Sequence, residues 1–379
     1  MLGTLPSQDF ESELAALLTI VITAQRGLMY RTTIAPEFSR TLEATKKLIM
    51  NIKAIMIRKL RVQSLKACIL LILLSMSGAP HAFEALVTNE RSGDLIHINA
   101  KGETTEVVPI CNRPRGMTLG IATNTVLIAC SDDHKVVTYD RVARSIENEI
   151  TAVPGAMNLS IHRATSRLFV TNEGASRASV YNLTTGNLIA KLPTGLEPDG
   201  IVTTADGQHI FVASENAGLI HVFDGENYLQ TDVIKTNLRP RRIAILDDEL
   251  WVSSEMGSRV EIFDVKTRRK KDEVIFAPRG FRLEQMTPVD ILFNPVADEA
   301  YVALGSANHI AVVDTKTLEI IKYILVGRRA WGLGLSPDHQ TLVVLNGLSD
   351  DFTLIDLATK RPILTKRTGL IPHSIEVFE

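Results

Sequence analysis

The chain has 379 residues, of which 45% are hydrophobic, which is enough to bury a sizeable core or to form one large all-β domain. Its 41 Lys and Arg nearly balance its 43 Asp and Glu, so nothing in the charge indicates a surface that binds nucleic acid. The three cysteines, Cys68, Cys111 and Cys130, make no metal spacing and no CxxC or CxxCH motif. This argues against a zinc ribbon, covalently bound haem and an iron–sulfur cluster, and we expect no cofactor.

Residues 56–82 have the three-part layout of a secretory signal peptide. A stretch with four Lys or Arg residues precedes a short apolar run at 67–76, and small and turn-forming residues follow up to Ala82. We therefore expect cleavage after Ala82, a periplasmic mature chain without a membrane span, and a true start at Met56. Residues 1–55 are then an over-long start or a non-globular extension. The alternative is an internal anchor helix behind a genuine cytoplasmic extension.

From residue 83 to residue 379, one pattern recurs seven times: an apolar strand, a short polar break, a second apolar strand, then Asn or Asp. Short alternating runs of Val, Ile, Phe and Tyr are typical of strands, and the Asn or Asp side chain favours a tight turn. A period near 42 residues with about four strands predicts a propeller blade. Each copy has a reference Val or Ile in its first apolar strand, and these are Val87, Ile128, Val170, Val212, Val252, Val302 and Val344. Twelve residues after each of them stands a turn-forming residue: Asn99, Asp140, Asn182, Asp224, Asp264, Asp314 and Asp356.

Each unit also holds a strand introduced by a turn that usually contains Pro. The seven such segments are 114–121, 154–161, 198–205, 240–247, 288–295, 330–337 and 372–379. We assign them as innermost strands around a central channel. The mature chain begins at Phe83 with the second strand of a blade, counted outward from the channel, and it ends with an innermost strand. This second strand is the first apolar strand of the repeat. The sequence therefore predicts an all-β, seven-bladed β-propeller of four-stranded antiparallel blades, in which the C-terminal strand completes the N-terminal blade.

The loops that enter the innermost strands and those that leave the second strands should meet on one face, where a propeller carries its function. The predicted site residues on this face are Glu90, Arg115, Glu173, Asp199, Glu215, Arg241, Glu255, Trp331 and His373. One interpretation is a polar pocket for an anionic or hydroxylated small molecule. Arg115 and Arg241 would then clamp a carboxylate, Trp331 would stack on a ring, and His373 would act as acid or base. In the other interpretation, Glu–Arg pairs join neighbouring blades and Trp331 plugs the channel.

Two further features stay open at this stage. Cys111 precedes an innermost strand and Cys130 ends the adjacent second strand at the same face, so they form either a disulfide or two buried free thiols. The loop 276–290 is longer than its counterparts and contains two Phe and two Arg residues. It either covers the channel mouth or docks a partner, or it is a packed insertion.

The chain resembles the YVTN-type β-propeller repeats, and is most similar to the PQQ-dependent catabolism-associated β-propeller proteins. The strings that carry the resemblance are NRPRG (112–116), ACSDD (129–133), LWVSSEMGSRVEIFD (250–264), YVALGSANHIAVVDTKTLE (301–319) and YILVGRRAWGL (323–333). The resemblance implies a secreted bacterial protein linked to transport and to the oxidation of alcohols by quinoprotein dehydrogenases. It does not imply quinone binding, because the chain has only two Trp and no calcium and quinone site. The sequence departs from the repeat at Gly305 and Gly347, where other copies have Glu.

Two functions follow as hypotheses. The first is a non-catalytic periplasmic binding or scaffold protein, whose partner is a small molecule, a quinoprotein dehydrogenase or a transporter component. The second is a lactonase-like hydrolase, which would use His373 with Glu90 as its catalytic pair. We favour the first, because the sequence has no nucleophile, metal or haem motif. The sequence does not name the ligand, the partner or the oligomeric state.

Overall fold

The computed structural model describes residues 83–379, together with Lys47 and Met50. The predictions of an extension at 1–55 and of a signal peptide at 56–82 otherwise lie outside the described residues. Where the chain is described, no helix is both long enough and apolar enough to cross a membrane.

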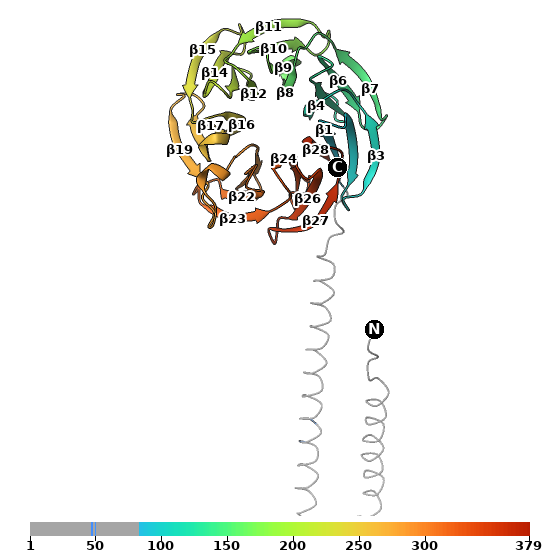
Figure 1. Cartoon of the computed structure of the whole chain (residues 1–379), viewed down its shortest axis with the longest axis vertical. Coiled ribbons are helices and arrows are strands. Elements are labelled where there is room, and N and C mark those ends of the chain that lie inside the picture. The colour runs from blue at the N-terminus through green and yellow to red at the C-terminus, as the bar shows by residue number, and fades with distance from the viewer. Residues whose placement is uncertain (1–46, 48–49, 51–82) are drawn as a thin grey trace, which may run out of the picture. The chain divides into compact units, whose positions relative to one another are not determined.

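Residues 83–379 form seven antiparallel sheets of four strands each, arranged as blades around one axis (Figure 1). Blade 1, from the axis outward, consists of β28 (Pro372–Phe378), β1 (Glu84–Asn89), β2 (Asp94–Asn99) and β3 (Thr104–Pro109). Blade 2 consists of β4 (Pro114–Leu119), β5 (Thr125–Cys130), β6 (Lys135–Asp140) and β7 (Ser145–Ile150). Blade 3 consists of β8 (Ala156–His162), β9 (Arg167–Asn172), β10 (Arg177–Asn182) and β11 (Leu188–Pro193).

The remaining four blades follow in the same order around the ring. Blade 4 consists of β12 (Pro198–Thr203), β13 (His209–Ser214), β14 (Leu219–Asp224) and β15 (Gln230–Lys235). Blade 5 consists of β16 (Pro240–Leu246), β17 (Glu249–Ser254), β18 (Arg259–Asp264) and β19 (Lys270–Ile275). Blade 6 consists of β20 (Ile291–Asn294), β21 (Glu299–Ala303), β22 (His309–Asp314) and β23 (Ile320–Leu325). Blade 7 consists of β24 (Ala330–Leu335), β25 (Thr341–Asn346), β26 (Asp351–Asp356) and β27 (Arg361–Arg367). Three short 3₁₀ helices, η1 (Arg163–Thr165), η2 (Glu255–Gly257) and η3 (Leu283–Gln285), lie in connecting segments.

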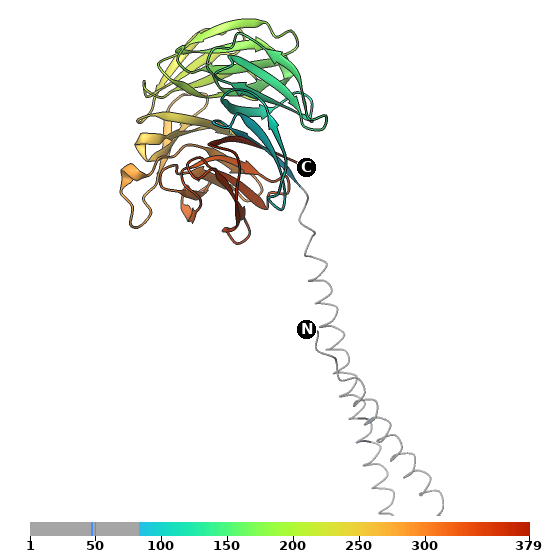
Figure 2. The same cartoon turned by 45° about the vertical axis from the view of Figure 1, so that its right-hand side comes forward.

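The ring closes within blade 1, as predicted. The innermost strand β28 pairs antiparallel with β1, so that Glu84 faces Phe378 and Val87 faces Ile375. The C-terminus lies beside these strands in both views (Figures 1 and 2). Because closure pairs the last strand with the first, the sheet that holds His373 is made from both ends of the propeller.

The core is divided among the junctions between blades. The described residues contain seven buried apolar clusters, and each combines side chains from two neighbouring blades. Between blades 7 and 1, for example, Phe352 packs with Val87 and Ile375. Each blade therefore buries one face against each neighbour, which explains why the same apolar pattern recurs in every repeat.

The seven Asn and Asp residues of the repeat have the turn role that the sequence predicts. Asp314, for example, accepts backbone hydrogen bonds from Lys316 and Thr317. All seven side chains accept a bond of this kind from an amide two or three residues further on. These turns lie on the same face as Phe83 and Glu379, which we call the opposite face. The innermost strands begin on the other face, which we call the mouth face.

Candidate binding site at the channel mouth

All nine predicted site residues lie on the mouth face. Five of them stand at the starts of innermost strands: Arg115 in β4, Asp199 in β12, Arg241 in β16, Trp331 in β24 and His373 in β28. The four glutamates, Glu90, Glu173, Glu215 and Glu255, directly follow β1, β9, β13 and β17. The backbone N–H of each glutamate donates to the carbonyl of the residue directly before the innermost strand of its own blade. This hydrogen bond fixes the position of the glutamate in the loop.

Arg115 joins three blades. Its guanidinium lies 3.1 Å from the carboxylate of Glu90 in blade 1 and 2.7 Å from that of Glu173 in blade 3. Arg113 donates to Glu90 at 2.9 Å. Burial acts to raise the pKa of Glu90, but His373, Arg115 and Arg113 together hold that pKa below its usual value. Glu90 is therefore a carboxylate that is already committed to two arginines.

Arg241 forms a denser cluster on the other side of the mouth. Its guanidinium lies 2.9 Å from Asp199, 3.1 Å from Glu215 and 3.0 Å from Glu255. Arg239 also pairs with Glu215, at 2.7 Å, and with Glu255, at 2.9 Å. Burial, and next the charge of Asp199, raise the pKa of Glu215 to about 8. Glu215 therefore carries a proton near neutral pH, and the protonated cluster has two positive and two negative charges.

These contacts match the second of the two interpretations made from the sequence. Arg115 and Arg241 bind carboxylates of the chain itself, and a ligand carboxylate would have to displace one of these pairs to be clamped. Buried arginines held by carboxylates from neighbouring blades join those blades together. The polar residues are thus brought together as predicted, but their charges are largely satisfied within the protein.

His373 and Trp331 lie next to the two clusters. His373 is only 3% exposed, and its Nδ1 has no hydrogen-bond partner among the described residues. Burial, and next the charge of Arg115, lower the pKa of His373 to about 3, so the imidazole is neutral at physiological pH. The guanidinium groups of Arg241 and Arg329 lie 4.9 and 4.5 Å from the centre of the Trp331 ring. Stacking of a ligand ring on Trp331 would compete with these two contacts.

These side chains surround a cavity of about 310 Å³, which we call the mouth pocket. Blades 1 to 5 contribute a polar wall, whose residues are Glu90, Arg115, Met157, Glu173, Glu215, Arg239 and Arg241. Blade 7 and the start of β28 contribute a more apolar wall, whose residues are Arg329, Trp331, Gly347, Leu348, Ile371, Pro372 and His373. A much smaller space of about 10 Å³, lined by Asp199, Asn158 and Arg242, shares Trp331 and His373 with the mouth pocket.

Three arginines of the mouth were not among the predicted site residues. Arg113 and Arg239 each stand before the Pro that opens an innermost strand, and Arg329 stands at the equivalent place in blade 7. All three have positive φ, between 56° and 61°, which turns the chain sharply into the strand. The repeated string Arg-Pro-Arg at 113–115 and 239–241 was the signal that could have identified the first two.

The structure also describes the two features that the sequence left open. Cys111 and Cys130 are joined by a disulfide bond, with their Cα atoms 5.9 Å apart. In the loop 276–290, Phe276 and Met286 are fully buried, whereas Phe281 is 38% exposed and packs edge-on against a histidine of blade 6. The loop is thus a packed insertion at its base with an exposed tip, and none of its residues lines the mouth pocket.

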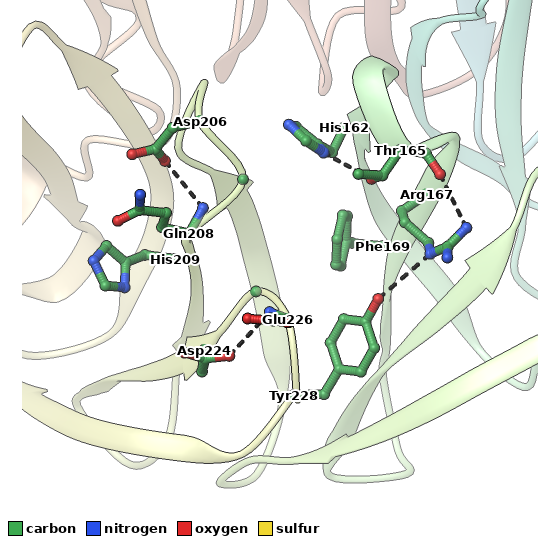
Figure 3. Close-up of a pocket in the computed structure, with 12 residues that line it drawn as sticks. His162, Thr165, Arg167, Phe169, Asp206, Gln208, His209, Asp224, Glu226 and Tyr228 are labelled. Carbon is green, nitrogen blue, oxygen red and sulfur yellow. Dashed lines mark hydrogen bonds between the residues drawn. The ribbon is translucent and has the colours of Figure 1, made fainter.

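A larger cavity of about 540 Å³ opens on the opposite face, between blades 3 and 4 (Figure 3). We call it the inter-blade cleft. Figure 3 shows His162, Arg167 and Phe169 of blade 3 facing Asp206 and His209 of blade 4. Equivalent turns of blades 5 and 6 form a similar cleft of about 590 Å³. The sequence did not predict a site here. In the part of the chain that is described, no group of three or more His, Cys, Asp or Glu side chains could hold a metal ion.

The chain matches the model of one known protein family. The family model of the choice-of-anchor I domain matches residues 120–342, which is more than half of the chain. The protein belongs to this family. For this choice-of-anchor I protein, family membership and the propeller fold favour a non-catalytic binding role outside the cytoplasm. The narrower resemblance to the PQQ-dependent catabolism-associated proteins stays a prediction.

Other similarities of this choice-of-anchor I protein are distant. It is 22% identical over 170 residues to Antigen Lp49 of Leptospira interrogans, which covers 39% of this chain and 36% of the antigen. The match thus spans about a third of that relative's length. A solved structure of a functionally unknown Desulfotomaculum acetoxidans protein has a TM-score of 0.67 at 11% identity, covering 78% of this chain and 98% of that one.

Two further solved structures belong to proteins named for an enzyme activity. Hydrazine synthase of Kuenenia stuttgartiensis has a TM-score of 0.61 at 16% identity, covering 69% of this chain and 88% of that one. The dihydro-heme d1 dehydrogenase NirN has a TM-score of 0.60 at 12% identity, covering 77% and 74%. At such identities the similarity is one of fold alone.

Proposed function

We propose that this protein is a non-catalytic periplasmic binding protein that holds a small molecule in the mouth pocket. The observation that carries the proposal is the imidazole of His373. It is 97% buried, lines the mouth pocket and leaves Nδ1 without a partner among the described residues. A buried polar atom without a hydrogen bond costs about 1–3 kcal/mol, and a bound ligand would supply the missing bond.

The same geometry argues against the hydrolase that we considered from the sequence. A general base works best when its pKa lies near the working pH. With a pKa of about 3, His373 is a weak base and is not protonated at neutral pH, so it is not available as an acid. Glu90 lies within 3.1 Å of two arginines, which hold it as a structural carboxylate. A binding role therefore needs fewer changes to the observed site than a catalytic one.

The finer part of the proposal rests on the sequence resemblance. It places the protein beside quinoprotein-dependent oxidation of alcohols or the associated transport, with a quinoprotein dehydrogenase or a transporter component as partner. The exposed tip of the loop 276–290 is a surface that such a partner could contact, because Phe281 and Leu283 are exposed there. No quinone site is proposed for this chain.

A thermal-shift screen tests the binding role. The protein is heated with aromatic alcohols, their acids, the quinone, lactones, esters and divalent metals. A ligand at one hundred times its Kd is expected to stabilise the protein by about 2.7 kcal/mol. His373→Phe should remove the shift, because phenylalanine keeps a ring but has no hydrogen-bonding atom.

The matched control is His162→Phe on the opposite face, which should leave the shift intact. If no compound stabilises the protein, the binding role at the mouth is wrong. If lactones or esters are turned over and His373→Ala abolishes the turnover, the hydrolase is correct instead.

A further inference from the structure

One position of the mouth departs from the repeat in two blades. Three residues after the reference Val of the repeat stands a glutamate in blades 1, 3, 4 and 5, and a glycine, Gly305 or Gly347, in blades 6 and 7. Gly347 in blade 7 keeps the backbone hydrogen bond of its counterparts, since its N–H donates to the carbonyl of Arg329 at 2.9 Å. The local backbone is therefore the same, and only the side chain is missing.

The two glycines differ in whether the fold requires them. Gly305 in blade 6 has φ of +45°, and a Cβ there would lie 2.5 Å from the carbonyl oxygen of Thr287. At Gly347, φ is outside the left-handed range, and a Cβ would meet only two carbonyl oxygens, both at 3.8 Å. Packing and backbone conformation thus explain Gly305 but do not explain Gly347. The absent side chain at Gly347 leaves part of the mouth pocket open.

The open side of the pocket is its apolar side. Leu348, Ile371 and Pro372 lie next to Gly347 in the pocket wall, and Leu348 is 52% exposed. Across the pocket, the arginines and carboxylates of the polar wall already pair with one another. A charged ligand buried there would have to displace one of these pairs, or draw Arg329 away from Glu255, 4.0 Å away, and from the Trp331 ring, which is costly. His373 lines the pocket as a neutral imidazole whose Nδ1 has no partner among the described residues, and a hydroxyl group can serve an imidazole nitrogen either as donor or as acceptor.

We infer that the mouth pocket takes an uncharged, hydroxyl-bearing molecule whose apolar body occupies the gap left at Gly347 and whose hydroxyl bonds to His373. This inference rests on the proposed binding function and specifies its ligand class. The glycine is then the position that admits the ligand, because a glutamate there, as in four other blades, would fill the gap.

Three probes with the same ring test the charge requirement: benzyl alcohol, benzoate and benzylamine. Each is titrated into the full-length protein, and binding is measured by ligand-observed NMR. Benzyl alcohol should bind at least tenfold more tightly than the other two. If benzoate or benzylamine binds as tightly, or if benzyl alcohol does not bind, the inference is wrong. The broader screen above then decides separately whether the binding function also fails.

Two variants test the place of the apolar body. Gly347→Gln fills the gap without adding charge and should weaken benzyl alcohol binding at least tenfold, while the melting temperature stays the same or rises. Gly347→Ala adds one methyl group and should change the affinity by no more than about threefold, since its Cβ meets no close contact. If Gly347→Gln folds normally and binds benzyl alcohol as the unchanged protein does, the ligand does not occupy the gap and the inference is overturned.

Discussion

The mouth pocket and the inter-blade cleft have different origins in the same repeat. The cleft is larger, but its polar side chains serve the turns of the blade: Asp206 accepts bonds from Thr204 and Gln208, and Asp224 caps its own turn. It also recurs between blades 5 and 6. The mouth pocket forms where the blades differ from one another, at positions such as Gly347 and His373. Cavity size therefore reflects blade geometry, and departure from the repeat is the better guide to a site.

The largest expected effect is a difference in the free energy of unfolding between one variant in the mouth and one in the cleft. Arg241→Met removes the only cation in the described part of the chain that pairs with the buried carboxylate of Asp199, whereas Glu215 and Glu255 keep Arg239, and it should cost about 3–5 kcal/mol because it leaves the Asp199 charge buried and unpaired. The matched change in the cleft, Arg167→Met, should cost about 1 kcal/mol or less. Urea unfolding of both variants measures the difference.

Equal losses in the two variants would mean that the Arg241 cluster is not a structural centre of the mouth. The mouth would then contribute no more to the free energy of unfolding than the cleft does. A loss for Arg167→Met alone would mean that the cleft contributes more than the mouth.

A smaller effect should appear in the pH dependence of stability. The pKa of Glu215 is raised to about 8 in the folded protein, so folding favours its protonated form. Its contribution is therefore fully present below its unfolded pKa of about 4.5 and is lost as the pH rises through about 8. Melting temperatures measured from pH 5 to 9 should fall with pH, and Glu215→Gln should make that fall shallower.

Glu226→Gln in the exposed wall of the cleft is the control for this profile and should leave its slope unchanged. Glu376, whose pKa burial also raises to about 8, adds to the same decline, so Glu215→Gln reduces the slope without abolishing it. An unchanged slope in Glu215→Gln would show that this carboxyl is ionised in the folded protein.

The fold was predictable because each blade buries the same positions. The alternation around Val87 and its six counterparts sets the strand register, and the turn-forming Asn and Asp residues set the hairpins. The place of the site residues followed from the same register, because position in the repeat determines which face a residue occupies. Arg115, Arg241 and His373 therefore lie on the mouth face, as expected.

The partners of these residues were not predictable. Arg115 reaches glutamates of both neighbouring blades, whereas Arg241 pairs within its own blade and with the preceding one. That choice depends on side-chain conformations and on which blade lacks a glutamate, and not on the spacing of the repeat. The same limit applies to Gly305 and Gly347, which are identical in the sequence pattern but differ in backbone angle and in the space around them.

The smallest expected effect lies in the cleft. Tyr228→Phe removes the contact between the Tyr228 hydroxyl and Arg167, which is long at 3.4 Å, and should cost less than about 1 kcal/mol. It should not change the affinity of any ligand bound at the mouth, because Tyr228 and the mouth pocket lie at opposite faces of the propeller. NMR titration of the variant with the mouth ligand checks this. If its affinity changes severalfold, the rigid blades transmit the change from one face to the other. The mouth and the cleft would then be parts of one coupled system rather than independent regions.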